Sequence, residues 1–466
     1  MKKKILLLFS VFNSFLLFSQ TIYENPQVDE RVELMSIVFR LAEADEYVLN
    51  AIPLYVSEID KYFGKYKNHS LINYTKTLRN EYGIGYDAVA GFSIFLEIKN
   101  KKIKLRQDIN LTQLDERWNT DSIPKYIALL NDFYKKTKFN KFFIKNKEIR
   151  ETAEANFIKE VTDKVDFDWF KNFFGYLPEK KIRIIVSLAN GWHNYGPKII
   201  YNDGQEEYYA IIGSCNENAQ GFPIYDVPFI DTKETLIHEI NHSFCNSLID
   251  EYLDKLMSSA IFFYKQNEKI FKSDGYGRAE SFLYEILTRA TVIQYVDKHE
   301  KGRYEYEVAK ERNAGFLWMP QLVEALKQYE INIENYAGLR GFMPEIVKLQ
   351  DSLNPQQLYN DIELHKPEIL GTNITNNDDS VDYNLDHINI YFDRPMLIGN
   401  NGSTAGKYNF PELLMSNWKS AQEWVMYVKL KPDTWYSIIF PYQYFITPNG
   451  YYSPKNTYTL NFKTRK

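Results

Sequence analysis

One segment constrains its own local structure more than any other part of this sequence. Residues 231–248 read Asp-Thr-Lys-Glu-Thr-Leu-Ile-His-Glu-Ile-Asn-His-Ser-Phe-Cys-Asn-Ser-Leu. Asp231, followed three residues later by Glu234, is typical of a capping box at the start of a helix. Apolar residues then recur at helical spacing, at Leu236, Ile237, Ile240, Phe244 and Leu248. The segment therefore predicts an amphipathic helix that begins near Asp231.

Two histidines on this predicted helix indicate a metal site. His238 and His242 are four residues apart, so both imidazoles project from the same helix face. Two neutral imidazoles at this spacing can bind one zinc ion. Glu239 completes the His-Glu-x-x-His pattern, in which the glutamate is the general base that acts on water. The alternative is a pair of structural histidines on a partly buried helix, which is disfavoured because the chain has only 7 His residues.

A catalytic zinc ion needs a third protein ligand and keeps a fourth position for water. Residues 276–290 predict a second helix that carries two carboxylates, Glu280 and Glu285. Helical periodicity places them on opposite margins of the apolar stripe, so it does not choose between them. Cys245 and Leu248 occupy the positions at which metzincins have Gly and His, which excludes that group of zinc peptidases.

At these residues the chain resembles a family of bacterial secreted proteins of gluzincin type. The shared core, Thr-Leu-Ile-His-Glu-x-x-His-Ser-Phe-x-Asn, is present at residues 235–246. The resemblance covers most of residues 25–330 and implies a zinc peptidase fold with Glu285 as the third ligand, but no particular substrate. Other matching segments are residues 31–34, 41, 46–47, 81–89, 194–196, 276–277 and 284–290.

One position departs from the thermolysin-like pattern, which has Asp four residues after the glutamate ligand. This chain has Arg289 there, so another carboxylate or carbonyl must orient the histidines. Two interpretations of Arg289 are open: it holds Glu285 in position, or it forms a surface ion pair.

Strands are predicted upstream of the motif helix, at residues 182–188, 198–201 and 208–213. Zinc peptidases of this type usually bind a peptide antiparallel to an edge strand, and residues 208–213 are the candidate for that strand. A Tyr or His often stabilises the oxyanion of the transition state. The candidates for that role are Tyr276, Tyr195 and His193.

The N-terminus predicts export. A basic start is followed by an apolar stretch to residue 18 and a polar exit with cleavage near residues 19–20, as in a secretory signal peptide; an uncleaved anchor is the alternative. No later segment is long and apolar enough to span a bilayer, so we expect a soluble protein in the periplasm or outside the cell. A net charge of −5 without a basic patch argues against nucleic-acid binding. Cys215 and Cys245 can either pair or remain free.

The residue pattern changes near residue 365. Helical patterns predominate before it, among them residues 46–62 and 123–165, whereas short strand-like runs at residues 388–392, 430–438 and 458–464 follow it. We therefore predict an α+β protein: a signal peptide (residues 1–20), a helix-rich zincin-like domain (21–364) and an all-β domain (365–466). The last of these resembles a bacterial Ig-like β-sandwich in its Phe-Asp-Arg-Pro-Met stretch, its Leu-Lys-Pro-x-Thr-x-Tyr turn and its terminal Phe-x-Thr.

These patterns predict a secreted zinc metallopeptidase that hydrolyses protein or peptide substrates. His238, His242 and Glu285 would hold Zn²⁺, and Glu239 would be the general base for a zinc-activated water. The alternative is a non-catalytic, zinc-containing binding protein whose Ig-like module contacts a cell surface or a glycan, although a structural zinc site needs no general base. Hydrolysis of a non-peptide amide or ester is a third possibility that the sequence does not distinguish.

Overall fold

The computed structural model describes residues 22–49, 52–118, 121–227, 230–273, 275–399, 401–452 and 456–466, so the predicted signal peptide lies outside the described residues. Helices and sheets both contribute, in agreement with the predicted α+β class. The chain divides into two compact units. The first consists of Met1–Phe167 and Leu177–Lys233, and the second of Asp168–Tyr176 and Glu234–Lys466.

The first unit is built on a four-stranded sheet. Its strand order is β1 (Tyr23–Gln27), β4 (Ile182–Ser187), β6 (Glu206–Gly213) and β5 (Lys198–Ile200). The first three strands are parallel, and β5 is antiparallel to β6. Residues of α1 (Glu30–Leu41) and α5 (Asp87–Ile94) share a buried apolar core with Ile185 and Ile211 of the sheet, so these two helices cover one of its faces.

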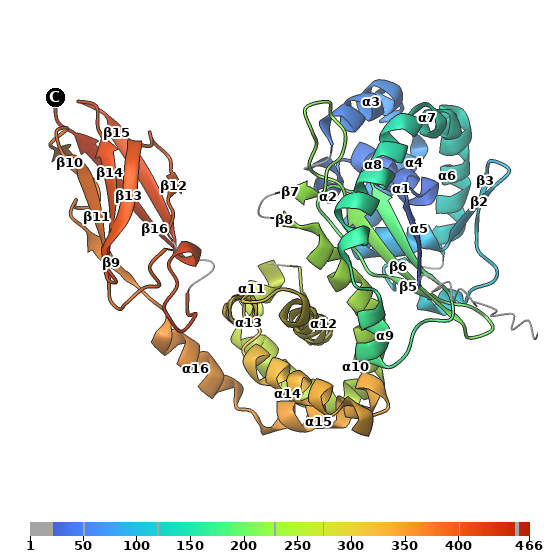
Figure 1. The fold of residues 1–466 in the computed structure, drawn as a ribbon. Coiled ribbons are helices and arrows are strands. Elements are labelled where there is room, and N and C mark those ends of the chain that lie inside the picture. Colours follow the sequence, from blue (N-terminus) through green and yellow to red (C-terminus); the bar gives the residue numbers. More distant parts are fainter. Residues whose placement is uncertain are drawn as a thin grey trace, which may run out of the picture. The chain divides into compact units, whose positions relative to one another are not determined.

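Helices surround this sheet (Figure 1). The predicted helical stretch 46–62 is interrupted before Pro53, because a proline disfavours helix in the residue that precedes it. The stretch 123–165 breaks at Lys138, which has a left-handed φ of 56°. The remaining helices of the unit are α2 (Asp45–Val48), α3 (Pro53–Phe63), α4 (Ser70–Tyr82), α6 (Ser122–Thr137), α7 (Phe139–Lys145) and α8 (Lys147–Glu160), and a hairpin joins β2 (Leu96–Lys99) to β3 (Lys102–Leu105).

The candidate substrate-binding strand, residues 208–213, does not lie at an edge, so this prediction was wrong. β6 pairs with β4 on one side and with β5 on the other. Beyond β5, the backbones of Tyr195 and Ile211 exchange two hydrogen bonds of 2.9 and 2.8 Å. Both sides of β6 are therefore occupied, and its almost continuous burial is typical of an interior strand.

The second unit begins with helices that pack through aromatic side chains. The ring of Phe244 on α10 (Thr232–Gln266) stacks on Phe174 of α9 (Asp168–Phe174), with centroids 4.3 Å apart. α14 packs against α12, α13 and α15, so that the helices form one layered group. The other helices of this group are α11 (Glu268–Ser273), α12 (Ala279–His299), α13 (Tyr304–Asn313), α14 (Met319–Ile331), α15 (Gly338–Ser352) and α16 (Pro355–His365).

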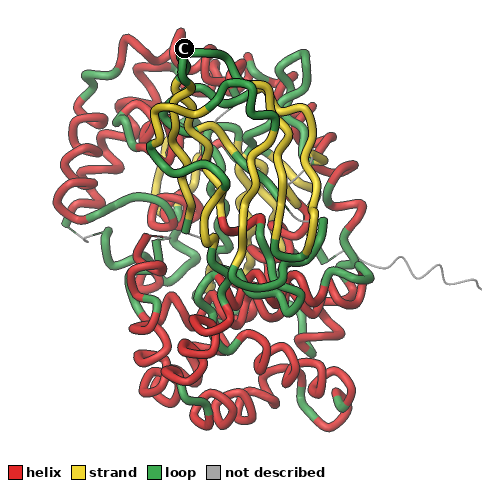
Figure 2. The backbone as a smooth tube through the Cα atoms, turned by 90° about the vertical axis from the view of Figure 1, so that its left-hand side faces the viewer, coloured by secondary structure: helices red, strands yellow, loops and turns green. Residues whose placement is uncertain are grey.

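The same unit ends in two four-stranded sheets, here called the C-terminal two-sheet region, whose strands are drawn in yellow near the C-terminus in Figure 2. Side chains of both sheets, among them Ile388 and Ile438, form one apolar core. The sheets are β13 (Glu412–Ser420), β14 (Glu423–Lys429), β11 (His387–Phe392) and β9 (Ile369–Thr372), and β10 (Asp378–Val381), β16 (Thr457–Thr464), β15 (Trp435–Pro441) and β12 (Thr404–Ala405).

The change from helices to strands falls between His365 and Ile369, close to the predicted position. The strands predicted at residues 388–392 and 458–464 are confirmed. β15 begins only at Trp435, because Asp433 adopts a left-handed φ of 49° in the turn before it. Among the described helices, none combines the length and the apolar character that crossing a membrane requires. Both cysteines are free thiols.

Candidate metal centre

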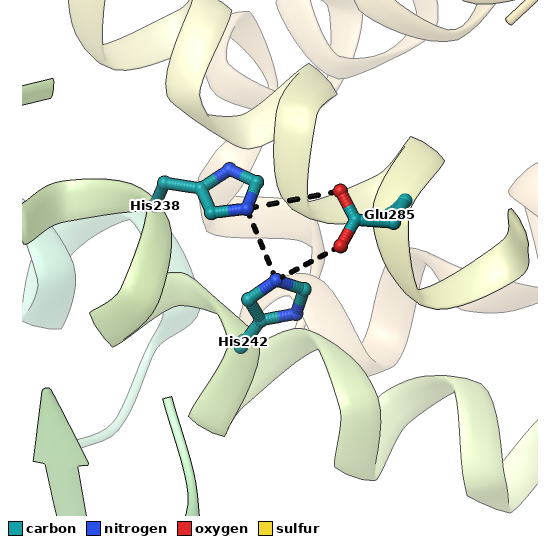
Figure 3. Close-up of side chains that lie close together, drawn as sticks. All are labelled: His238, His242 and Glu285. Carbon is teal, nitrogen blue, oxygen red and sulfur yellow. Dashed lines mark hydrogen bonds and ion pairs between the residues drawn. The ribbon is translucent and has the colours of Figure 1, made fainter. Parts of the chain in front are cut away.

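Two helices of the second unit bring three metal-ligating side chains together. His238 and His242 project from α10, and Glu285 faces them from α12 (Figure 3). The two Nε2 atoms are 3.0 Å apart. Glu285 Oε1 lies 3.3 Å from His242 Nε2, and its Oε2 lies 3.7 Å from His238 Nε2. Each side chain thus directs one ligand atom toward the same point.

The donor atoms fit a zinc ion in type and in spacing. In a tetrahedral site with bonds of about 2.0–2.1 Å, ligand atoms lie roughly 3.3 Å apart. The separation of the two Nε2 atoms, 3.0 Å, and the separations from each of them to an oxygen of Glu285, 3.3 Å to Oε1 and 3.7 Å to Oε2, scatter around that value. Two imidazoles and one carboxylate are also the donor set of thermolysin-type sites. The three side chains retain 12–19% exposure, so a small solute can reach them.

Burial and mutual contact set the protonation of the cluster. Burial, together with the neighbouring His242, lowers the pKa of His238 to about 3. Burial also opposes the charging of His242, but the hydrogen bond and negative charge of Glu285 raise the pKa of His242 to about 9. Despite its burial, the pKa of Glu285 is held well below its usual range by Arg289 and the two histidines. A proton on His242 therefore lies where a metal ion would displace it, because metals bind neutral imidazole.

Glu239 is buried beside the cluster without belonging to it. Its side chain is only 6% exposed, and burial raises the pKa of its carboxyl group to about 7. The group of potential metal ligands comprises His238, His242 and Glu285 alone among the described residues. A carboxyl with a pKa near neutrality can both accept and release a proton, which is what a general base requires.

Asn246 and Thr288 orient His242 from behind. The Nδ1 atom of His242 lies 3.2 Å from Asn246 Oδ1 and 3.3 Å from Thr288 Oγ1. Partners of this kind fix the ring orientation and tautomer of a metal-binding histidine. The amide carbonyl of Asn246 and the hydroxyl group of Thr288 thus orient His242, a role that the thermolysin-like pattern gives to a carboxylate. Sequence reasoning missed both residues, although the position of Asn246, four residues after His242, was a usable signal.

Arg289 holds Glu285 in position. Its Nε donates to Glu285 Oε2 at 2.8 Å, its Nη1 to Glu311 Oε2 at 2.9 Å, and its Nη2 to the Tyr276 hydroxyl at 2.9 Å. The guanidinium also lies 5.0 Å from the ring centroid of Phe316. The interpretation of Arg289 as a surface ion pair is therefore wrong, since all these partners lie around the cluster. Glu311 was not identified from the sequence.

The other predicted site residues lie as follows. Glu280, the rival third ligand, is 36% exposed in its side chain and lies 3.5 Å from Arg278. Tyr276 is in contact with Arg289 rather than with the ligands themselves. His193 and Tyr195 belong to the first unit, where their rings stack 6.5 Å apart. Burial lowers the pKa of His193. Roles of these residues at an oxyanion stay predictions.

Comparison with solved structures finds surface-layer proteins at low similarity. The crystal structure of the S-layer protein rSbsC is 14% identical and covers 50% of this chain and 34% of that one, with a TM-score of 0.17. The N-terminal part of the bacterial S-layer protein SbsC is 12% identical, covers 50% of this chain and 58% of that one, and has a TM-score of 0.16. The chain thus spans about a third of the first protein.

No curated protein matches the sequence. A family model does match, over residues 26–349, and it is described as a domain of unknown function, DUF4932. This range contains strands β4, β5 and β6 of the first unit and all three residues of the metal cluster. The match spans more than half of the chain. The protein therefore belongs to the DUF4932 family.

Proposed function

We propose that the protein is a secreted zinc metallopeptidase of gluzincin type, with the C-terminal two-sheet region as an Ig-like accessory domain. One observation carries the proposal: His238, His242 and Glu285 converge with zinc-like spacing, and Glu239 lies buried next to the first ligand without joining the group. A purely structural zinc site needs no general base, so the buried carboxyl group of Glu239 favours a catalytic site.

The residues of the chain would divide the chemistry between them. A bound zinc ion supplies a Lewis acid that activates water and polarises the substrate carbonyl. Glu239 accepts the proton of the water and donates it to the leaving amine, a transfer that its pKa of about 7 favours in both directions. Asn246, Thr288 and Arg289 hold the ligands in place. A peptide is the proposed substrate by analogy with other proteins that carry this motif.

Zinc content tests the ligand set. The purified protein should hold one zinc ion, measured by atomic emission after dialysis against buffer with trace zinc. Glu285→Ala should lose the metal, because it removes one of three ligands. Glu280→Ala is the matched control on the same helix and should retain it. If the wild-type protein takes up no zinc, or if both variants behave alike, the proposed metal site is wrong.

The general base is tested separately. Glu239→Gln keeps the size of the side chain and the metal ligands but removes the group that accepts a proton. We expect a full complement of zinc and a peptide-hydrolysis rate at least about 100-fold lower, measured on a mixed peptide library. Equal activity of wild type and variant would contradict the role of Glu239. A zinc-loaded wild-type protein that cleaves no peptide would favour a non-catalytic binding protein.

A further inference from the structure

Helix α13 connects the two helices that carry the candidate metal ligands. At its start, Arg303 Nη2 lies 2.8 Å from Glu234 Oε2, one turn before His238 on α10. Near its end, Glu311 Oε2 lies 2.9 Å from Arg289 Nη1, and Arg289 in turn contacts Glu285 on α12. The distance between the histidines and the carboxylate therefore depends on the position of α13, in addition to direct contacts between α10 and α12 such as Asn241 Nδ2 to Thr291 Oγ1 at 3.0 Å.

The carboxylates that make these connections are shielded from water. The side chains of Glu234 and Glu311 are 17% and 8% exposed. Glu307, which is 3% exposed, holds Arg303 and Lys310 within the same helix segment. Pairs with buried partners are screened by salt much less than pairs on an open surface. Removing one member is also costly, because the other remains buried without its partner. These ion pairs therefore fix the position of α13 relative to α10 and α12.

A turn of the C-terminal two-sheet region, residues 447–452, docks on the end of α13. The carbonyl oxygen of Gly450 accepts hydrogen bonds from Arg312 Nη2 at 3.0 Å and from Asn313 Nδ2 at 2.8 Å. The backbone N–H of Tyr452 donates to Asn313 Oδ1 at 3.2 Å. Arg312 and Asn313 directly follow Glu311, so the turn is hydrogen-bonded to the helix next to the residue that contacts Arg289.

The turn packs closely against α13 at Gly450. Gly450 has a φ of +76°, and a Cβ atom added there would lie 2.8 Å from the Cβ of Ala309 on α13. The neighbouring ring of Tyr451 lies 3.8 Å from the Arg312 guanidinium, and its hydroxyl donates to Asp361 at 2.8 Å. The turn thus combines close backbone packing with directed polar contacts.

We propose that the turn at residues 447–452 is a positioning element for the metal centre. It fixes the end of α13, and α13 holds Glu285 at its distance from His238 and His242. The C-terminal two-sheet region is then part of the scaffold of the metal site, not only an attached module. The proposal rests on the proposed zinc site for its functional consequence, but the mechanical link itself is independent of metal.

A pair of glycine substitutions in the full-length protein tests this inference. Gly450→Ala adds a methyl group against Ala309, whereas Gly399→Ala adds one at a φ of +118° with nothing within 4 Å. Both variants carry the strain of an alanine at positive φ. We expect Gly450→Ala to weaken zinc binding about three- to tenfold, measured by competition with a chromogenic chelator, while Gly399→Ala leaves it unchanged. Equal affinities in the two variants would overturn the proposal.

A rescue variant separates positioning from general damage. Ala309→Gly removes the atom that the new methyl group would meet, so Ala309→Gly combined with Gly450→Ala should bind zinc as Ala309→Gly alone does. Failure of this rescue would also contradict the proposal. If Gly450→Ala does not fold, Tyr451→Ala serves instead, since it deletes the Arg312 and Asp361 contacts of a partly exposed side chain. It should weaken zinc binding in the same direction.

Hydrogen–deuterium exchange tests the link between the turn and α13 in protein that holds no metal. In chelator-treated protein, Gly450→Ala should speed amide exchange in α13 and α12 relative to Gly399→Ala. If wild-type protein binds no zinc yet this difference appears, the proposed function fails and the mechanical link stands. If zinc binds but neither exchange nor affinity responds to Gly450→Ala, the link fails and the proposed function stands.

Discussion

Glu239 illustrates how burial of one carboxyl group sets both chemistry and stability. Because its folded pKa is raised from 4.5 to about 7, the folded protein binds the proton more tightly than the unfolded chain does. This contribution to stability is present below about pH 4.5 and is lost as the pH rises toward 7. Above that pH, the buried charge destabilises the fold.

Glu239→Gln should therefore stabilise the chelator-treated protein at pH 8, by on the order of 1–3 kcal/mol, and should have little effect at pH 4. Urea unfolding at both pH values measures this. Glu280→Gln is the control, because that side chain is 36% exposed and its substitution should change neither value. A variant less stable than wild type at pH 8 would contradict the cost assigned to this buried carboxylate.

Asn246 provides a second prediction for a single residue. Its Oδ1 lies 3.2 Å from His242 Nδ1, so Asn246→Ala should leave Thr288 as the remaining partner of that nitrogen and loosen the orientation of the imidazole. We expect zinc affinity to fall about tenfold, with the fold intact. Ser247→Ala, at the next position of the same helix, should leave the affinity unchanged. Calorimetric titration with zinc measures the affinity of both variants. A similar loss of affinity in the two would show that the effect arises from a weakened α10 and would contradict the orienting role of Asn246.

At the scale of the element, α12 supplies three functions from one face. Glu285, Thr288 and Arg289 follow at helical spacing, and they provide the carboxylate ligand, an orienting hydroxyl and a cation that holds the carboxylate. Such a constellation is rigid, because a single helix fixes the relative positions of all three. The position of this face relative to α10 depends on the direct contact of Thr288 with His242 and on the ion pairs that join both helices to α13.

Arg289→Met should weaken both the metal site on α12 and the stability of the fold. The substitution leaves Glu285 and Glu311 buried near each other without their shared cation. We expect zinc affinity to fall at least about tenfold and the unfolding temperature to drop. Arg278→Met, at the N-cap of the same helix and 69% exposed in its side chain, should change neither quantity. Comparable losses in the two variants would refute the positioning role of Arg289.

At the scale of the whole molecule, one exposed edge creates a risk of self-association. β13 forms an edge of its sheet, and Leu413, Leu414 and Met415 on it are 44%, 61% and 54% exposed. Edge strands with apolar side chains are prone to pair with other chains. Leu414→Lys should lower concentration-dependent association, measured by light scattering. Leu364→Lys changes a leucine of similar exposure (70%) on helix α16 and should have a smaller effect.

Several features of the candidate site followed from local sequence. The start of α10 at Thr232 lies one residue from the predicted start, and the shared face of His238 and His242 follows from helical periodicity, which is a property of neighbouring residues. The parallel strand β4 and the strand β11 were equally readable from short apolar runs. By contrast, β13 was missed because it is largely exposed and shows no apolar alternation. β14 was also missed, although its buried residues form a short apolar run of the same kind as β4 and β11.

What the sequence by itself determined is the set of side chains that one helix must present together. Helical periodicity left Glu280 and Glu285 open, and only the family resemblance pointed to Glu285. The tertiary structure decided that Glu285 faces the histidines, because the rotation of α12 depends on its packing against other helices. It also decided that β6 is interior, since strand neighbours come from distant parts of the chain. Local periodicity specifies which face of an element is apolar; which partner meets that face is set by contacts far apart in sequence.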